Sequence, residues 1–298
     1  MFIHQIDRPN TRRFFLFPYA ILGSIVAGFI CSFLGVFVVS QRVVFLGAAL
    51  TQAAIAGVAF SFLHLLNLEE LIASAFGIQS IDDSFLHHFE HTFFSLLFAV
   101  LAVIIFSQSN RQKLLTTDSL LGIIFVVAIA LRIIFIQKSP IAEVAEIESI
   151  LKGDILFLGS QEFFTLLIIL VIIFFIFTLF SKQLRFVTFD ADTAAAHGIN
   201  DRFWLLIFYL TVGVGISLTT RFVGDVFTFA FLILPASTAL MLAKRVKGVF
   251  IYAIIIGSVI PPIAIYLAFV YDISSGPTAV VVALLIFLTV FVIKKLRN

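Results

Sequence analysis

Residues 163–181 read FFTLLIILVIIFFIFTLFS, a stretch without a single Asp, Glu, Lys or Arg. As a helix it would be about 28 Å long, close to the ~30 Å thickness of the hydrocarbon core of a bilayer. Charge-free runs of comparable length occur at 14–41, 43–68, 91–110, 203–220, 226–243, 248–271 and 273–293, and Arg132 alone interrupts 119–137. The sequence therefore predicts an all-α polytopic membrane protein with eight or nine transmembrane helices.

The composition excludes several classes of protein. Charged residues make up 12% of the 298 residues, whereas soluble domains have about 25%. The connections between the hydrophobic runs are too short for a nucleotide-binding or catalytic domain, since even 138–162 has only 25 residues. The single cysteine, Cys31, excludes an internal disulfide and a cysteine metal site within one chain. Because no run carries a pattern for intramembrane catalysis, the sequence predicts a protein that is not an enzyme and takes its energy from a partner or an ion gradient.

The basic residues are distributed unevenly among the connections. Connections 67–90 and 138–162 hold most of the acidic residues. The alternate connections, with the C-terminus, hold 12 of the 19 Lys and Arg residues: Arg42, Arg111, Lys113, Lys182, Arg185, Arg202, Lys244, Arg245, Lys247, Lys294, Lys295 and Arg297. Because Lys and Arg are retained on the cytoplasmic side, we expect this second set to lie inside a bacterial cytoplasmic (inner) membrane.

The N-terminal segment, residues 1–13, includes Arg8, Arg12 and Arg13. It is predicted to lie along the membrane surface as an interfacial segment, ahead of a single transmembrane domain at 14–298. With nine spanning helices and a cytoplasmic C-terminus, the N-terminus would lie outside, where these arginines break the charge rule. The sequence leaves eight and nine helices open.

Two polar residues fall inside hydrophobic runs. Gln52 lies about eight residues into its helix, roughly 12 Å deep, and a polar amide there is costly unless it is bonded. Gln52 could hydrogen-bond a neighbouring helix or face a translocation path. Arg132 lies toward the outer end of its run, where we expect its side chain to reach the lipid headgroups.

Small residues and a proline mark two further runs. Ala49, Ala53 and Gly57 repeat every fourth residue, a stripe that lets another helix approach closely in lipid. Pro235, in FLILPASTAL, removes the backbone bond to the carbonyl of Phe231 and predicts a kink. Kinks of this kind are common in membrane helices and do not by themselves identify a gate.

A cluster of metal-ligand side chains lies on the predicted outer side. It consists of His87, His88, Glu90 and His91, of which His87 and His91 would share a face of a helix. Imidazole with carboxylate suits Zn²⁺ and similar ions. The same histidines could instead be solvated at the membrane surface.

The cytoplasmic connection 182–202 reads KQLRFVTFDADTAAAHGINDR. Asp190 or Asp192 can cap a short helix over 193–196, which Gly198 would end. A short amphipathic helix parallel to the membrane is what a transporter needs to dock on a soluble motor, although a plain interfacial helix has the same pattern.

The order of these features resembles one family, the membrane permeases of ABC importers for zinc, manganese and iron. The segments that carry the resemblance are LGVFVVSQRVVFLGAALTQAAIAGVAFSF (34–62), TTDSLLGI (116–123), LKGDIL (151–156), TFDADTAAAHGI (188–199), TTRFVGDVFTFAFLILPASTALMLAK (219–244) and YDISSGPTAVVVALLIF (271–287). The resemblance implies a homodimer or a heterodimer with a second permease, two cytoplasmic ATP-binding subunits, and an extracytoplasmic solute-binding protein. It also implies lipid but no nucleic acid as a partner.

The resemblance implies roles for particular residues. By analogy Asp190, Ala194 and Gly198 would contact the ATPase, which would bind the ATP, while the permease would bind no cofactor stably and would pass a metal ion. The translocation path would involve residues on two helices: Ala48, Thr51, Gln52, Pro235 and Ser237.

The sequence departs from the family at the expected metal ligands. Where the family reads Gly-Asp-Ala-Leu-Ser-His-Ala, residues 47–53 read GAALTQA, so Ala48 and Gln52 replace the acid and the imidazole. Leu240 replaces an Arg that usually follows the proline motif. Three explanations stay open: other groups bind the metal, a second permease supplies the ligands, or the cargo is a metal complex or another small solute. A gradient-driven carrier is an alternative, but such carriers usually place ionisable residues at the midplane.

Overall fold

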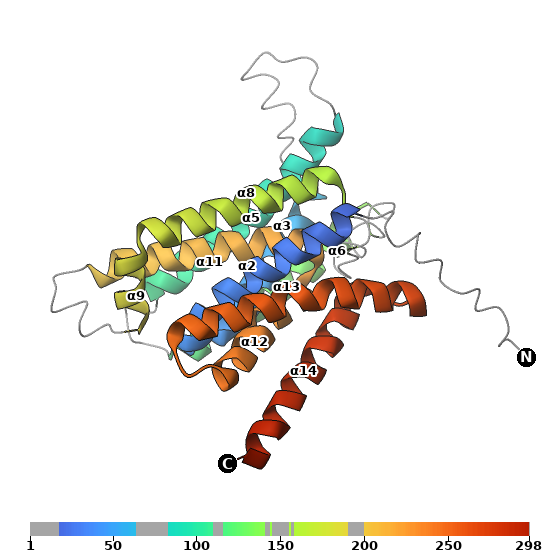
Figure 1. Cartoon of the computed structure of the whole chain (residues 1–298). Helices are drawn as coiled ribbons and strands as arrows, with labels where there is room; N and C mark the ends of the chain where they lie inside the picture. The colour runs from blue at the N-terminus through green and yellow to red at the C-terminus, as the bar shows by residue number, and fades with distance from the viewer. Residues whose placement is uncertain are drawn as a thin grey trace, which may run out of the picture. The chain divides into compact units, whose positions relative to one another are not determined.

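The computed structural model describes residues 18–63, 83–109, 116–140, 144, 155, 158–189 and 200–297. In this part of the chain, nine helices are long and apolar enough to cross a membrane (Figure 1). They are α2 (Pro18–Ser40), α3 (Val44–Ser61), α5 (Asp83–Ser109), α6 (Thr117–Lys138), α8 (Ser160–Leu179), α11 (Asp201–Val223), α12 (Asp225–Leu242), α13 (Val246–Tyr271) and α14 (Ser275–Arg297), and a short helix, α9 (Ser181–Phe189), follows α8. The all-α prediction is confirmed, with nine candidate spans among the described residues.

The chain divides into two compact units. The first unit comprises 1–36, 152–170 and 222–298, and the second comprises 37–151 and 171–221. The predicted interfacial segment 1–13 lies outside the described residues, so it stays a prediction, as does the single domain at 14–298.

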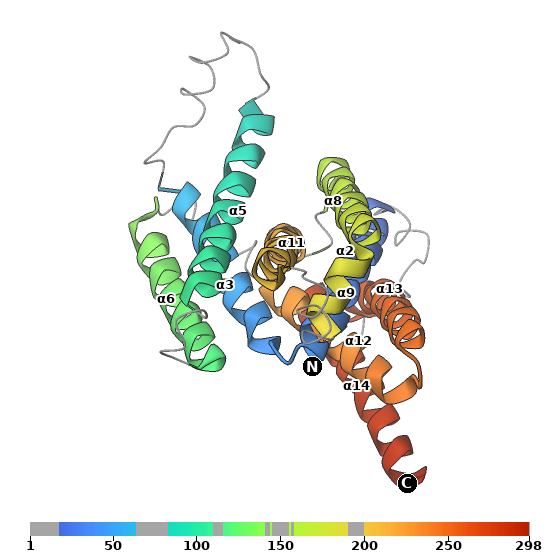
Figure 2. The same cartoon turned by 90° about the vertical axis from the view of Figure 1, so that its left-hand side faces the viewer.

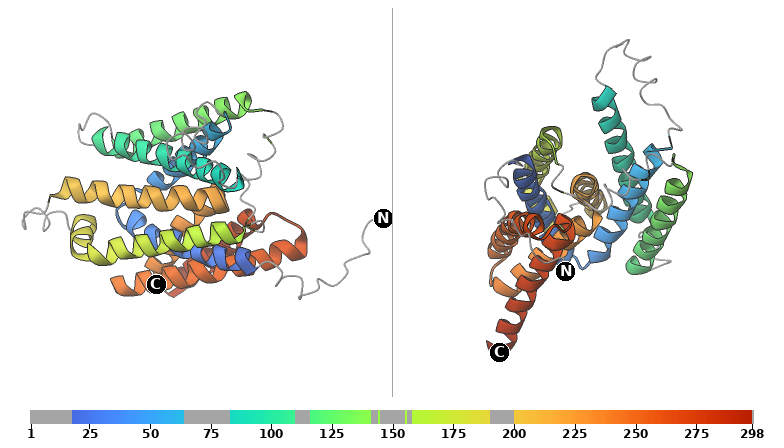
Figure 3. Two further views of the ribbon diagram at one scale, coloured as in Figure 1. Left: turned by 90° about the horizontal axis from the view of Figure 1, so that it is seen from above. Right: turned by 90° about the vertical axis from the view of Figure 1, so that its right-hand side faces the viewer.

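The second unit is built around α3. This helix packs against both α5 and α6, between which it lies in Figure 3. Its stripe of small residues is buried, and at Gly57 an added Cβ would lie only 2.3 Å from the backbone oxygen of Phe94 on α5. The close approach of another helix that the stripe predicted is therefore found here, and the partner is α5.

A cluster of phenylalanines joins the same three helices. The ring of Phe60 on α3 lies 5.1 Å from Phe94 and 5.5 Å from Phe98 on α5, and 5.3 Å from Phe135 on α6, measured between centroids. Aromatic rings at such distances attract one another beyond the area that they bury. The three helices, side by side in Figure 2, are thus held together at one end of α3.

The first unit depends on backbone contacts between helices. The helices α12, α13 and α14 pack on one another, and α2 crosses α13 at Gly28, where an added Cβ would lie 2.0 Å from the backbone oxygen of Gly257. At Gly35 the corresponding distance to the backbone oxygen of Leu232 on α12 is also 2.0 Å. Because lipid tails are as apolar as leucine, helices in a membrane associate largely through such close packing.

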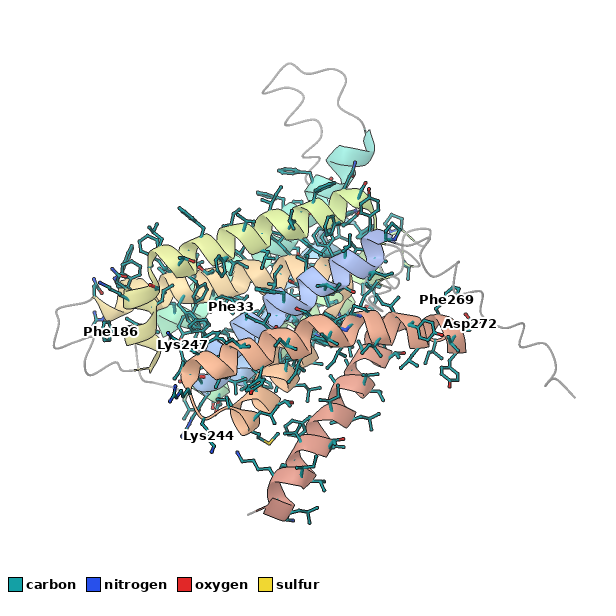
Figure 4. All side chains as sticks on the ribbon, in the orientation of Figure 1. Phe33, Phe186, Lys244, Lys247, Phe269 and Asp272 are labelled. Atoms are coloured by element: carbon teal, nitrogen blue, oxygen red, sulfur yellow. The ribbon has the colours of Figure 1, made fainter. Side chains whose placement is uncertain are left out.

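Charges mark the two ends of α13. Figure 4 shows Lys244 and Lys247 at the end where α13 begins, and Asp272 at the end where it stops. Lys294 of α14 lies with the basic end, because its Nζ donates to the backbone oxygen of Met241, 2.9 Å away, in the last turn of α12. A cation suits the carbonyl end of a helix. Lys244, Lys247 and Lys294 therefore lie at one end of the helices, the end predicted to face the cytoplasm.

The crossing of α2 and α13 generates a prediction. We expect Gly28→Ala to lower the free energy of unfolding by about 1–3 kcal/mol, because the added Cβ would meet backbone, which cannot rotate away as a side chain can. Thermal unfolding in detergent measures this loss. The matched control is Gly122→Ala on α6, where an added Cβ meets nothing within 4 Å. Equal melting temperatures for the two variants would contradict the packing described here.

Candidate functional site

The two polar residues inside the predicted spans lie against each other. The Nη1 group of Arg132 on α6 donates a hydrogen bond to Oε1 of Gln52 on α3, with 2.9 Å between the atoms. Both side chains are half-buried. Of the two situations foreseen for Gln52, the structure shows a bond to a neighbouring helix. One Nη group of Arg132 thus bonds to an acceptor on the neighbouring span, and the expectation that the side chain reaches the headgroups stays a prediction.

Aromatic pairs lie on both sides of this hydrogen bond along the contact of α3 with α6. Phe45 and Phe125 lie 5.3 Å apart between ring centroids on one side, and Phe60 and Phe135 lie 5.3 Å apart on the other. Both helices run through these contacts in the same direction, so they are parallel. The Gln52–Arg132 pair falls between the two aromatic contacts in both sequences.

The other two path candidates on α3 are more deeply buried. Ala48 is 6% exposed and Thr51 is 2% exposed. The Thr51 hydroxyl donates to the backbone oxygen of Ala48, 2.9 Å away in the preceding turn. Gln52 is therefore the most accessible of the three, and their common role in a path stays a prediction.

Pro235 and Ser237 lie on α12 in the first unit. Pro235 is buried and Ser237 is half-buried. The helix continues through the proline from Asp225 to Leu242, and the Thr238 hydroxyl donates to the backbone oxygen of Leu234 at 2.7 Å. This bond is to Leu234 and not to the carbonyl of Phe231, which is the group that loses its helical donor at Pro235. A role of Pro235 and Ser237 in transport stays a prediction.

His91 has a well-defined environment near the start of α5. Its Nδ1 is hydrogen-bonded to the Ser61 hydroxyl, and its ring stacks on Phe62 with centroids 4.2 Å apart. The Ser61 hydroxyl also lies 2.6 Å from the backbone oxygen of Val58, so it can donate to that oxygen or to Nδ1, and the tautomer of His91 follows from that choice. A neighbour that holds one ring nitrogen is usual for a metal-binding histidine.

The rest of the predicted metal cluster is only partly described. Glu90 is 5% exposed and His91 is 2% exposed, while the side chains of His87 and His88 lie outside the described residues. Within the described part, no group of three or more His, Cys, Asp or Glu side chains could hold a metal. A site formed by all four residues stays a prediction.

The coupling residues Asp190, Ala194 and Gly198 lie outside the described residues, together with the helix expected at 193–196. Immediately before them lies α9, which the sequence analysis did not foresee. Leu184 and Val187 of α9 are buried, whereas Lys182 and Phe186 are exposed, so the helix is amphipathic. The spacing of Leu184 and Val187 is the signal that could have revealed it.

Comparison with known proteins gives a consistent result over nearly the whole chain. The ABC 3 transport family matches residues 14–294. The manganese transport system membrane protein MntC of Listeria monocytogenes is 28% identical over 274 residues, 91% of this chain and 88% of MntC. A probable iron transport system membrane protein of Haemophilus influenzae is 25% identical over 272 residues, with 91% and 88% covered.

A solved structure has a similar fold. The structure described as PsaBC from Streptococcus pneumoniae in complex with Fab matches with a TM-score of 0.74 and 23% identity, over 92% of this chain and 90% of that chain. The relatives are membrane components of transport systems, which confirms that this chain is not itself an enzyme. The predicted localisation, multi-pass in a bacterial cytoplasmic (inner) membrane, is confirmed by the same match and the nine apolar helices of the described part. Since the family match extends from the beginning of the first span into the last one, the chain belongs to the ABC 3 transport family.

Proposed function

We propose that the chain is the membrane-spanning permease of an ATP-binding-cassette importer that carries zinc, manganese or iron into the cytoplasm. The observation that carries this proposal is the family match over residues 14–294, which takes in the nine candidate spans of the described part. Two relatives are named as manganese and iron transport proteins, which supports a transition metal as the cargo.

The proposal requires partners, because the connections between the spans are too short to hold a motor domain. We infer separate cytoplasmic subunits that bind and hydrolyse ATP, an extracytoplasmic solute-binding protein, and a second permease, either identical or different. The sequence supports ATP hydrolysis by a partner as the source of energy. The helix α3, for example, has no Asp or Glu that could couple transport to a proton gradient. The permease itself is expected to hold no cofactor stably.

The proposed contact with the ATPase is the cytoplasmic connection 182–202. It begins with α9, an amphipathic helix that can lie along a surface. The residues that we expect to contact the motor are Asp190, Ala194 and Gly198, which follow α9 in the sequence.

This assignment predicts a loss of coupling. The purified chain should hydrolyse no ATP by itself, and co-expression with its cognate ATPase should give a stable complex. Asp190→Lys or Gly198→Pro should reduce ATP-dependent metal uptake by the reconstituted complex at least about tenfold, equivalent to ~1.4 kcal/mol in the contact. Glu162→Lys is the control, because it makes the same charge change at a helix end predicted to face outside. Unchanged uptake with Asp190→Lys and Gly198→Pro would show that the motor contacts another segment.

We further propose that His87, His88, Glu90 and His91 capture the metal on the outer side. The bond from His91 to Ser61 supports this role, because a metal-binding imidazole is usually oriented by a neighbour at its second nitrogen. Glu90 and His91 are both buried. Their burial supports a metal site where the outer connection joins the spanning helices, and not one on the exposed surface of that connection.

The capture site predicts separate effects on binding and on stability. The double variant His87→Gln with His88→Gln should weaken Zn²⁺ binding, measured by calorimetry, at least about tenfold without lowering the melting temperature. Ser61→Ala should lower the free energy of unfolding by about 1 kcal/mol, because His91 loses its partner. His4→Gln, outside the cluster, is the control for binding. If the double variant binds Zn²⁺ as tightly as this control, the histidines are not ligands.

A further inference from the structure

The helices α12, α13 and α14 carry their basic residues at a single end. Between Val226 and Asn298 the sequence contains six basic residues, all at this end, and one acid, Asp272, which follows α13 at the opposite end. Figure 4 shows Lys244 and Lys247 at the end of α13 opposite to Asp272. We call the five basic residues whose side chains the structure describes the basic end, and all five are exposed: Lys244, Arg245, Lys247, Lys294 and Lys295.

These helices do not neutralise the charges of the basic end. Asp272 lies 25 residues beyond Lys247, about 38 Å along α13, and Asp225 begins α12 at the end away from the basic end. Charges at physiological ionic strength are screened beyond about 8 Å. Lys294 donates to the neutral backbone oxygen of Met241, so it keeps its charge. The other four side chains of the basic end form no ion pair within the part of the chain that the structure describes.

Exposed apolar side chains lead away from the basic end along α14. Counted back from Lys295, they occur at spacings of four and three residues, which places them on one face of the helix. They are Val281, Leu284, Leu288 and Phe291, which are 42–55% exposed. Lys295 therefore lies at the end of an apolar stripe of 14 residues, about 21 Å long.

The helix α13 repeats this pattern from Lys247. One turn after another, Ile251, Ile255 and Val259 follow it, and all three are 52–57% exposed. This second stripe is about 18 Å long. One leaflet contributes about 15 Å to the hydrocarbon core of a bilayer, so each stripe is long enough to line the acyl chains of a whole leaflet.

A cation at the end of an apolar stripe fits a phospholipid better than a water-soluble anion. The ammonium group of a lysine reaches the headgroup region while its stem stays on apolar surface, and basic residues at this depth attract anionic lipids. A free phosphate would pair with the cations but leave the stripes uncovered. A soluble protein would reach the cations, but not the part of each stripe that lies in hydrocarbon.

We propose that the basic end and the two stripes bind phospholipids with an anionic headgroup. The cations hold the phosphate oxygens, and the acyl chains lie along α13 and α14. Because one phosphate accepts hydrogen bonds from several ammonium groups, a bound lipid also links the ends of these helices, where Lys294 already joins α14 to α12. This inference goes beyond the proposed function, since it depends on neither the cargo nor ATP.

The test measures lipid binding to the full chain by native mass spectrometry, in a neutral detergent and without an ATPase. The probes are phosphatidylglycerol, phosphatidylcholine with the same acyl chains, and glycerol 3-phosphate. We expect phosphatidylglycerol to bind at least about tenfold more tightly than phosphatidylcholine, and glycerol 3-phosphate not to displace it. Equal affinities for the two lipids would overturn the proposal. Displacement by glycerol 3-phosphate would also overturn it, because it would show a site for a water-soluble phosphate.

The double variant Lys247→Gln with Lys295→Gln removes the cation at the end of each stripe. Each basic residue at an anionic surface contributes a factor of about five in affinity, so this variant should bind phosphatidylglycerol at least about tenfold more weakly than the native chain. Arg42→Gln with Lys138→Gln is the matched control, because it removes two exposed cations outside the basic end. The proposal fails if the two double variants bind phosphatidylglycerol equally tightly.

Two further variants separate the charge from the fold. Lys247→Arg with Lys295→Arg keeps both cations and should bind phosphatidylglycerol within about twofold of the native chain. If the double glutamine variant fails to fold, Lys295→Gln alone, in the last turn of α14, should still weaken binding about fivefold. Unchanged binding in Lys295→Gln, or a loss in the arginine variant as large as in the glutamine variant, would contradict a role of the charges.

Other occupants of this surface would be recognised in the same experiments. If the double glutamine variant binds lipid like the native chain but no longer forms a complex with its cognate ATPase, the basic end contacts the motor. Dimers separate from monomers by mass in the same spectra. If monomers bind phosphatidylglycerol and dimers do not, a second copy of the chain covers the stripes. Either result would overturn the proposal.

Discussion

Hydrocarbon offers no partner for a hydrogen bond, so the protein itself has to satisfy each polar group within a span. Hydroxyl groups do this locally. Thr51, Thr219 and Thr238 each donate to a backbone oxygen three or four residues earlier, at 2.7–2.9 Å. These bonds need nothing beyond their own helix, and for that reason a threonine or serine in a span is weak evidence for a transport path.

Polar side chains that form hydrogen bonds between two helices say more about the packing of the helices than those bonded within one helix. In the second unit, Ser95 and Ser217 join α5 to α11 with 3.0 Å between their hydroxyl oxygens, and His91 joins α5 to Ser61 of α3. In the first unit, the Ser275 hydroxyl of α14 accepts from the backbone nitrogen of Ile155 at 3.1 Å. The Gln52–Arg132 pair differs from these contacts, because it brings a guanidinium against the middle of α3.

Much of the fold could be predicted because its determinants are local. A charge-free run such as 163–181 identifies a span by length and composition alone, and α8 begins at Ser160, close to the expected boundary. The small-residue stripe of α3 correctly indicated a close helix neighbour. The stripe could not show that the neighbour at Gly57 is the backbone of α5, because a stripe describes only one of the two surfaces in contact. The amphipathic helix α9 was missed because its nine residues lie beside a more conspicuous run of turn and cap residues at 190–198.

The sequence by itself determined the class of protein, the spans and the family, since the free energy of placing a segment in lipid is a sum over its own residues. Through the resemblance it also predicted that Ala48 and Gln52 stand where the family has an acid and an imidazole. Only the tertiary structure showed what Gln52 contacts, because its partner Arg132 is 80 residues away in the sequence. Similarly, Ser61 lies 30 residues from His91 and fixes the orientation of its ring. No periodicity or spacing within one helix records such a pairing, because it depends on which faces of two helices meet.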